Sequence, residues 1–213
     1  KGFLVLALHH SVGADAPVCE SSNSDCEGTY ATVAGGDGNS ASGKYAFIGG
    51  GKSNLIKSSN SYSVVSGGES NTATADHSSI AGGSSNKIVD TSQYTTIGGG
   101  YSNTASDDGT TASVIAGGAR NMMMGQYAVV SGGYVNAVTG DWSNVAGGQG
   151  NYIEAHHGGI GSGQNNNVVT NGHWSFVSGG SSNTAGAPYS GVIGGQYNTV
   201  LGQWSTVAGQ YAR

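Results

Sequence analysis

Charged side chains are scarce in this chain: only 9% of its 213 residues are Asp, Glu, Lys or Arg, and the formal net charge is −5. A nucleic-acid or anionic membrane surface needs clustered Lys and Arg, so we expect neither kind of partner. Proline occurs only twice and glycine does not recur at every third residue, which excludes a collagen triple helix. No apolar run is long enough to cross a bilayer, so we predict no membrane insertion.

Arrangements of residues that could act in catalysis or metal binding are equally sparse. The expected strand faces hold almost no charge and offer no Ser, His and Asp arrangement, so we predict no catalytic residue, no enzyme activity and no cofactor. Carboxylates gather at one expected loop edge, where a weak Ca²⁺ site is conceivable and a solvated edge is the simpler interpretation: Asp76, Asp90, Asp107, Asp108, Asp141 and Glu154. The histidines show no metal-ligand spacing, so we predict no metal site: His9, His10, His77, His156, His157 and His173.

Cysteine is limited to Cys19 and Cys26. The six residues between them permit a small disulfide loop, and two free thiols are the alternative. We predict the disulfide, which would agree with an extracellular protein.

Glycine, in contrast, is abundant at 40 residues, and most of it belongs to a repeat. The segment Tyr127 to Val138, YAVVSGGYVNAV, shows its grammar: an aromatic residue, a short run with Val or Ile, Gly-Gly, and a second run that opens with Asn. The chain contains eleven motif asparagines: Asn39, Asn54, Asn71, Asn86, Asn103, Asn121, Asn136, Asn151, Asn166, Asn183 and Asn198. Six of their ten spacings are 15, and the extra residues always precede the next aromatic position, so insertions should leave from one edge of a coiled repeat.

The repeat predicts an all-β fold, a parallel β-solenoid (β-roll) of about 12 coils with about 15 residues and two short strands per coil. Alternation along the strands places Val or Ile and the small residue two before it inside a narrow core. Gly-Gly supplies a turn because glycine adopts positive φ readily. Identical residues of successive coils should lie about 4.8 Å apart. The asparagines should therefore form a structural ladder in which each side-chain amide bonds the next coil.

Aromatic residues recur at one further position, which we assign to the outward side of the first strand. The predicted interface or ligand platform consists of Tyr30, Tyr45, Tyr62, Tyr94, Tyr127, Trp142, Trp174, Tyr189 and Trp204, with His77, Ala112 and His157 at the same position in other coils. Outward neighbours such as Phe47 and Phe176 extend it, whereas the second strand is mostly polar outside. A contiguous apolar strip indicates an interface between molecules. The alternative is that the rings sit at a coil corner and stack only on one another.

Three segments are expected. Residues 1–16 are apolar and read as a signal remnant or as a strand that docks on a neighbouring copy. Residues 17–29 form a cysteine-containing cap, and residues 30–213 form the solenoid, whose last turn we expect to present a strand edge.

The runs Ser143 to Gly147 and Ser205 to Gly209 resemble the repeats in the head domains of YadA-type trimeric autotransporter adhesins. The Gly-Gly-x-x-Asn arrays are also similar to repeats in fibre-like surface proteins of bacteria, algae and their viruses. These resemblances imply a rod on an outer surface that serves attachment or structure.

The sequence therefore predicts a secreted or surface-exposed structural or adhesive solenoid that self-assembles as an adhesin rod or filament subunit. The expected partners are further copies, through the aromatic face and open solenoid ends. Surface glycans or a host receptor are the other candidates. Ice binding, which a regular small-residue array would favour, and glycan binding on Tyr and Trp remain the alternatives.

Overall fold

The structure of the chain is a computed structural model. It describes residues 17–20, 23–57, 61–89, 92–106 and 112–212. The expected segment 1–16, with His9 and His10, lies outside these residues, as do Asp90, Asp107 and Asp108 of the expected acidic edge. Among the described residues none is helical, so they include no helix that could span a membrane.

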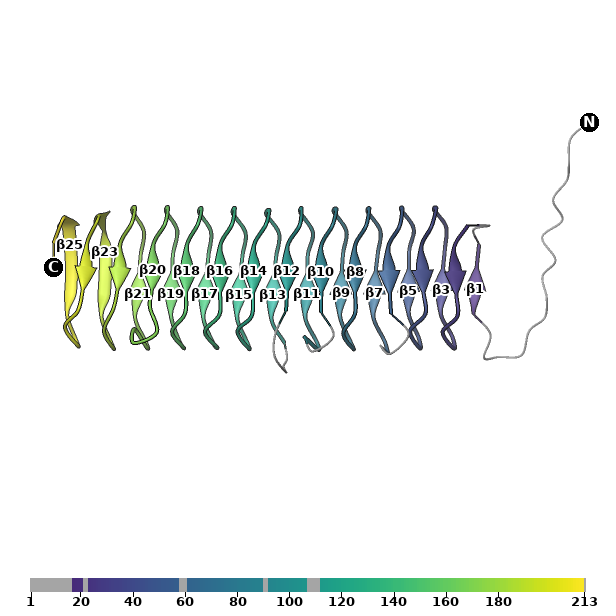
Figure 1. Cartoon of the computed structure of the whole chain (residues 1–213), viewed down its shortest axis with the longest axis horizontal. Coiled ribbons are helices and arrows are strands. Elements are labelled where there is room, and N and C mark those ends of the chain that lie inside the picture. Colours follow the sequence, from purple (N-terminus) through teal and green to yellow (C-terminus); the bar gives the residue numbers. More distant parts are fainter. Residues whose placement is uncertain (1–16, 21–22, 58–60, 90–91, 107–111, 213) are drawn as a thin grey trace, which may run out of the picture.

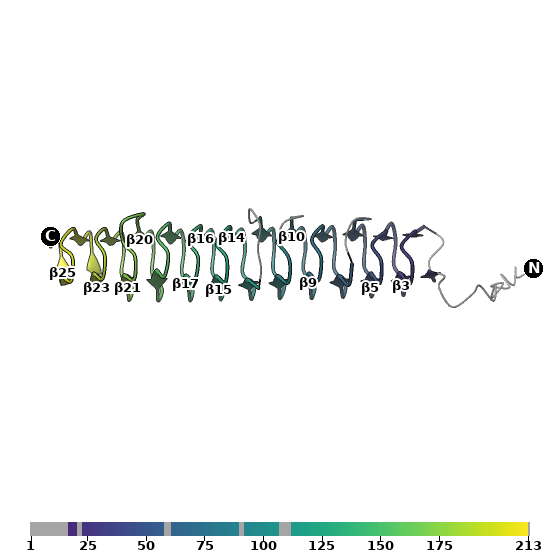
Figure 2. The same cartoon turned by 90° about the horizontal axis from the view of Figure 1, so that it is seen from below.

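The described chain winds into a rod of stacked coils (Figures 1 and 2). Each coil contributes one strand to each of two parallel sheets. In the described part of the chain, sheet A has 13 strands: β1 (Val18–Cys19), β3 (Thr32–Val33), β5 (Phe47–Ile48), β7 (Val64–Val65), β9 (Ser79–Ile80), β11 (Thr96–Ile97), β13 (Val114–Ile115), β15 (Val129–Val130), β17 (Asn144–Val145), β19 (Gly159–Ile160), β21 (Phe176–Val177), β23 (Gly191–Gln196) and β25 (Thr206–Gln210).

Sheet B lies opposite and has 12 strands in the same described residues: β2 (Asp25–Cys26), β4 (Ser40–Ala41), β6 (Leu55–Ile56), β8 (Thr72–Ala73), β10 (Lys87–Ile88), β12 (Thr104–Ala105), β14 (Met122–Met123), β16 (Ala137–Val138), β18 (Tyr152–Ile153), β20 (Asn167–Val168), β22 (Thr184–Ala185) and β24 (Thr199–Val200). The predicted parallel β-solenoid, with about 12 coils of about 15 residues and two strands per coil, is confirmed.

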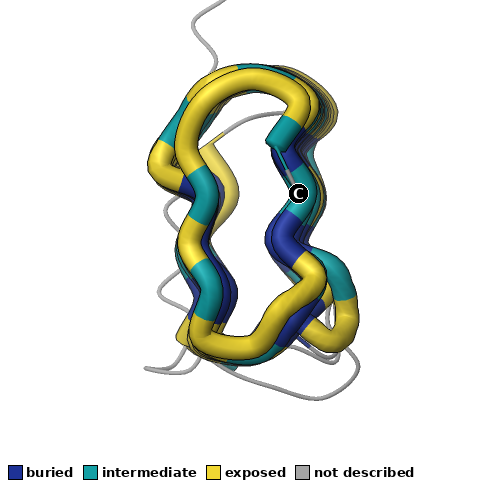
Figure 3. Tube along the Cα trace, turned by 90° about the vertical axis from the view of Figure 1, so that its left-hand side faces the viewer, coloured by how far each residue is buried: buried dark blue, intermediate teal, exposed yellow. Residues whose placement is uncertain are grey.

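The coils superimpose along the axis, and their inward positions are buried (Figure 3). Ile97, for example, pairs in register with Ile80 on one side and Ile115 on the other, and all three are fully buried. Burial of one Ile stabilises by about 1.5–3 kcal/mol, which is too little to fix a coil in isolation. Stability therefore comes from stacking between neighbouring coils.

Two corners connect the sheets in every coil. We call the corner from sheet A to sheet B the Gly-Gly corner, and the corner from sheet B to the next strand of sheet A the ladder corner. At both corners one residue adopts a left-handed conformation, such as Val135 (φ 56°) and Trp142 (φ 52°). Its N–H then points to the preceding coil, as from Trp142 to Gln126 O at 2.8 Å, whereas strand N–H groups point to the following coil, as from Val129 to Ser143 O at 2.9 Å.

The motif asparagines line the inside of the Gly-Gly corner and are all buried. Asn136 is typical: its Oδ1 accepts the backbone N–H of Asn151 at 3.0 Å, and its Nδ2 donates to Gly132 O and to Gly148 O, each at 3.0 Å. Direct amide-to-amide bonds occur at only some steps, such as Asn198 Nδ2 to Asn183 Oδ1 at 3.0 Å. The ladder therefore joins the coils mainly through backbone groups.

In the pair Gly147-Gly148, only the second glycine is required by this corner. Gly148 has φ +91°, and a Cβ there would collide with the carbonyl of Gly163 and lie 2.6 Å from Asn151 Nδ2. A Cβ on Gly147 would meet no atom within 4 Å. Ser162 occupies the first position of one coil, which agrees with this difference.

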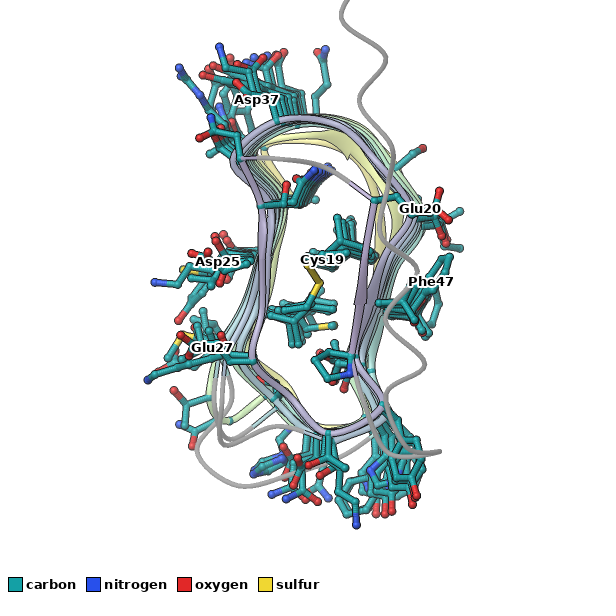
Figure 4. The ribbon with its side chains drawn as sticks, turned by 90° about the vertical axis from the view of Figure 1, so that its right-hand side faces the viewer. Cys19, Glu20, Asp25, Glu27, Asp37 and Phe47 are labelled. Atoms are coloured by element: carbon teal, nitrogen blue, oxygen red, sulfur yellow. A yellow bond between two sulfur atoms is a disulfide. The ribbon has the colours of Figure 1, made fainter. Side chains whose placement is uncertain are left out.

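The predicted disulfide between Cys19 and Cys26 is confirmed, and it lies inside the first coil (Figure 4). Cys19 pairs in register with Val33 and Cys26 with Ala41, so the two sulfur atoms occupy core positions of the repeat. The bond joins sheet A to sheet B where later coils have only apolar contact. Strands β1 and β2 of the 17–29 segment pair with β3 and β4, so within the described residues this segment extends both sheets.

Candidate functional site

Rings stack along the ladder corner and form what we call the aromatic ladder. Its two stacks contain Tyr30, Tyr45, Tyr62, His77 and Tyr94, and then Tyr127, Trp142, His157, Trp174, Tyr189 and Trp204. Neighbouring centroids lie 4.7–5.1 Å apart in the first stack and 4.1–5.6 Å apart in the second, with planes within 18° and 9° of parallel. The coil spacing thus sets the stacking distance.

The ladder residues do not lie on the outward side of the first strand, where the sequence had suggested them. They lie in the turn before it, as Tyr127 does two residues before β15. Every one of them has φ between 52° and 61°, a conformation that costs an ordinary L-residue about 1–2 kcal/mol. Alternation along a strand could not reveal this, because the turn interrupts it.

The turn itself does not need an aromatic residue. Ala112 holds the same position with φ 59°. The left-handed position of the Gly-Gly corner is filled mostly by small residues, such as Gly38, Ser53 and Ser70. The same backbone conformation therefore accepts small side chains at one corner and carries rings at the other. The rings are there for stacking or for the surface that they form.

This surface is broad, and most of its rings are Tyr and Trp. The ring side chains of the ladder, which we call its rungs, are between 37% and 71% exposed where they are Tyr or Trp. Their edges face solvent because their faces cover one another. The adjoining outward residues of sheet A extend the apolar strip through Phe47, Val64, Val114, Val129 and Phe176. Figure 4 shows Phe47 projecting from one side of the coil and Asp25 and Glu27 from the opposite side.

Sheet B is less uniformly polar than the sequence suggested. Its outward positions include Ser40, Thr72, Lys87, Thr104, Asn167, Thr184 and Thr199, as expected. Leu55 and Met122 are also exposed there, and Tyr152 is half-buried. At the Gly-Gly corner, Tyr101 and Tyr134 are exposed beside polar residues, and the Lys52 Nζ to Glu69 Oε1 distance is 3.9 Å.

A shallow groove of about 310 Å³ opens beside the ladder, lined by Asp141, Trp142, His156, His157, His173 and Trp174. His157 stacks between the two indoles, and His156 and His173 form a second stack with centroids 5.5 Å apart. Asp141 Oδ1 accepts the Gln126 N–H at 2.9 Å, and Asp141 Oδ2 lies 3.2 Å from His156 Nδ1. Spacing along the sequence did not reveal this groove, although two adjacent histidines at 156 and 157 were its one visible sign.

Of the other carboxylates of the expected acidic edge that the structure describes, Asp76 bonds to the backbone and Glu154 is exposed. Asp76 Oδ1 accepts the Ser61 N–H at 2.6 Å, as Asp141 does for Gln126. Within the described ranges, no three His, Cys, Asp or Glu side chains converge as metal ligands. The asparagine ladder and the disulfide therefore stabilise the coils, and the aromatic ladder with its groove remains the candidate functional surface.

Comparison with known families and with curated proteins identifies no match to this sequence.

Proposed function

We propose that this chain is an extracellular structural rod that associates with further copies of itself along the aromatic ladder, as an adhesin shaft or a filament subunit. The proposal rests on the presence of aromatic residues at the ladder corner of most coils. Ala112 occupies the same turn with the same φ, so the rings are not needed to make the turn. They add an uncharged surface along the rod, and such a surface favours burial against a partner.

A second copy is the partner that best fits the ladder. The rings of the ladder repeat at 4.1–5.6 Å, which is the spacing of coils in this fold. The rings of a second solenoid that lies alongside could therefore face them one to one. The adjoining valines and phenylalanines of sheet A widen the strip beyond the ring edges. Extracellular location is supported by the disulfide in the first coil, because such bonds persist in oxidising compartments.

Ice binding receives less support. Thr32, Thr96 and Thr206 are outward on sheet A, but Phe47, Asn144 and Phe176 interrupt them. A uniform array of small hydroxyl side chains is therefore missing from the described strands of this sheet. A thermal hysteresis assay on the purified protein would detect the activity directly.

Negative-stain microscopy of the purified chain at rising concentration tests the proposal. We expect rods that lie side by side in register or lengthen into filaments. Single separate rods at every concentration would contradict self-association.

A further inference from the structure

The groove beside His157 differs from the rest of the ladder because rings of unequal size meet there. An imidazole is smaller than an indole, so His157 covers only part of the face of Trp142 and of Trp174. The His157 centroid lies 5.2 Å from that of Trp142 and 5.0 Å from that of Trp174. Where the imidazole does not reach, the two indole faces are therefore separated by a gap that is one ring thick.

The exposure of four rungs agrees with this difference in ring size. Tyr45 and Tyr189, each between rings of equal or larger size, are 37% and 39% exposed. Trp142 and Trp174, on either side of His157, are each 53% exposed. Ring faces are also open beside Ala112, between Tyr94 and Tyr127, and at Trp204, but only at His157 do two indole faces of the described ladder oppose each other across a smaller ring.

Polar groups stand along one wall of this notch. His156 Nδ1 accepts the Asp141 backbone N–H at 3.1 Å, so His156 offers Nε2 to a ligand, while His173 offers its ring nitrogens and the Asp141 carboxylate adds acceptor oxygens. Apolar faces with a few convergent polar groups are the usual composition of a small-molecule site. Asp141 is the one carboxylate in the lining, and no Lys or Arg lines the groove, so it offers no fixed cation to bind an anionic ligand.

We propose that this groove binds a neutral saccharide, with one pyranose ring inserted between Trp142 and Trp174. The C–H faces of the sugar contact the two indoles, and its hydroxyl groups hydrogen-bond to Asp141 and to the two wall histidines. The site does not depend on self-association of the rod.

A second notch in the ladder provides an internal control. His77 also lies between two larger rings, Tyr62 and Tyr94, which are 54% and 53% exposed. The residues that precede these three rungs are Ser61, Asp76 and Gln93, so this notch has no imidazole wall. It should bind a sugar far more weakly.

Saturation-transfer difference NMR with the methyl pyranosides of glucose, galactose and mannose, and with phenol as an aromatic probe, tests the site. We expect transfer to at least one pyranoside in the unmodified chain. The variant His157→Trp fills the notch with a third indole and should weaken binding about tenfold or more, equivalent to about 1.4 kcal/mol. His173→Ala removes part of the wall without altering the ladder and should also weaken it. The matched variant His77→Trp should leave binding unchanged, and circular dichroism checks that all variants fold.

Three results would overturn the proposal. Absence of transfer to every pyranoside would show that no sugar binds, and preferential binding of phenol would show an aromatic-ligand site instead. Equal loss in His157→Trp and His77→Trp would show that the contact is not specific to this groove.

Discussion

Asn151 donates its backbone N–H to the side-chain Oδ1 of Asn136 across 3.0 Å, so one buried amide holds the corner of the next coil. Asn136 also satisfies two glycine carbonyls through Nδ2. Asn136→Ala would remove the partner of the Asn151 N–H and of the Gly132 carbonyl, at about 1–3 kcal/mol for each that stays buried, whereas the Gly148 carbonyl keeps the Tyr134 N–H at 2.9 Å. We expect the free energy of unfolding to fall by about 3 kcal/mol or more, measured by urea denaturation.

Asn144→Ala is the matched control for this substitution. Asn144 is exposed on the outward side of β17, and we expect a change within about 0.5 kcal/mol. Equal effects of the two substitutions would contradict the structural role of the asparagine ladder.

The two glycines of one corner should respond differently to the same methyl group. In Gly148→Ala, positive φ and collision with the Gly163 carbonyl should displace the neighbouring coil. Gly147→Ala should be tolerated, because nothing lies within 4 Å of the new Cβ. Thermal denaturation of the two variants checks this, with a much lower midpoint expected for Gly148→Ala. Similar midpoints would show that the corner can relax around a side chain.

Loss of the disulfide should affect the first coil most. A disulfide of this kind typically contributes about 2–4 kcal/mol, and coils of a solenoid interact only with their neighbours. In the double variant Cys19→Ser, Cys26→Ser we expect fast amide hydrogen exchange at β1 and β2 and little change beyond Asn71. Uniform acceleration along the rod would mean that the solenoid unfolds as one unit.

The interruption of the aromatic ladder at Ala112 can be filled. In Ala112→Tyr the new ring would lie one rung from Tyr94 and one from Tyr127, and a stacked aromatic pair contributes about 0.5–1.5 kcal/mol beyond its burial. We expect a higher denaturation midpoint than for Ala112→Leu, which adds apolar volume at the same strained φ without a ring. A denaturation midpoint of Ala112→Leu equal to or higher than that of Ala112→Tyr would show that stacking does not stabilise the ladder.

Periodicity predicted the coils because buried positions restrict residue type. Ile97 and Asn103 belong to columns where only β-branched or small residues, or Asn, fit the interior. The repeat pattern did not identify the first coil, because Cys19 and Cys26 occupy its core positions and no Gly-Gly-x-x-Asn motif connects them.

The corners could not be predicted in the same way. Tyr127 and Val135 adopt left-handed conformations that their residue types disfavour, so no local propensity marks them as turn residues. The groove depends on the difference in size between His157 and the indoles of adjacent coils, which emerges only when the coils are stacked. The expected interface and the surface partners remain predictions.

Sedimentation velocity of the unmodified chain beside the double variant Tyr127→Ser, Trp142→Ser tests most directly whether the ladder joins copies. The control is the double variant Tyr101→Ser, Tyr134→Ser, which removes two exposed rings from the Gly-Gly corner. We expect the unmodified chain and the control to sediment as concentration-dependent oligomers and the ladder variant as smaller species. Identical sedimentation of all three proteins, or a monomer at every concentration of the unmodified chain, would contradict assembly through the aromatic ladder.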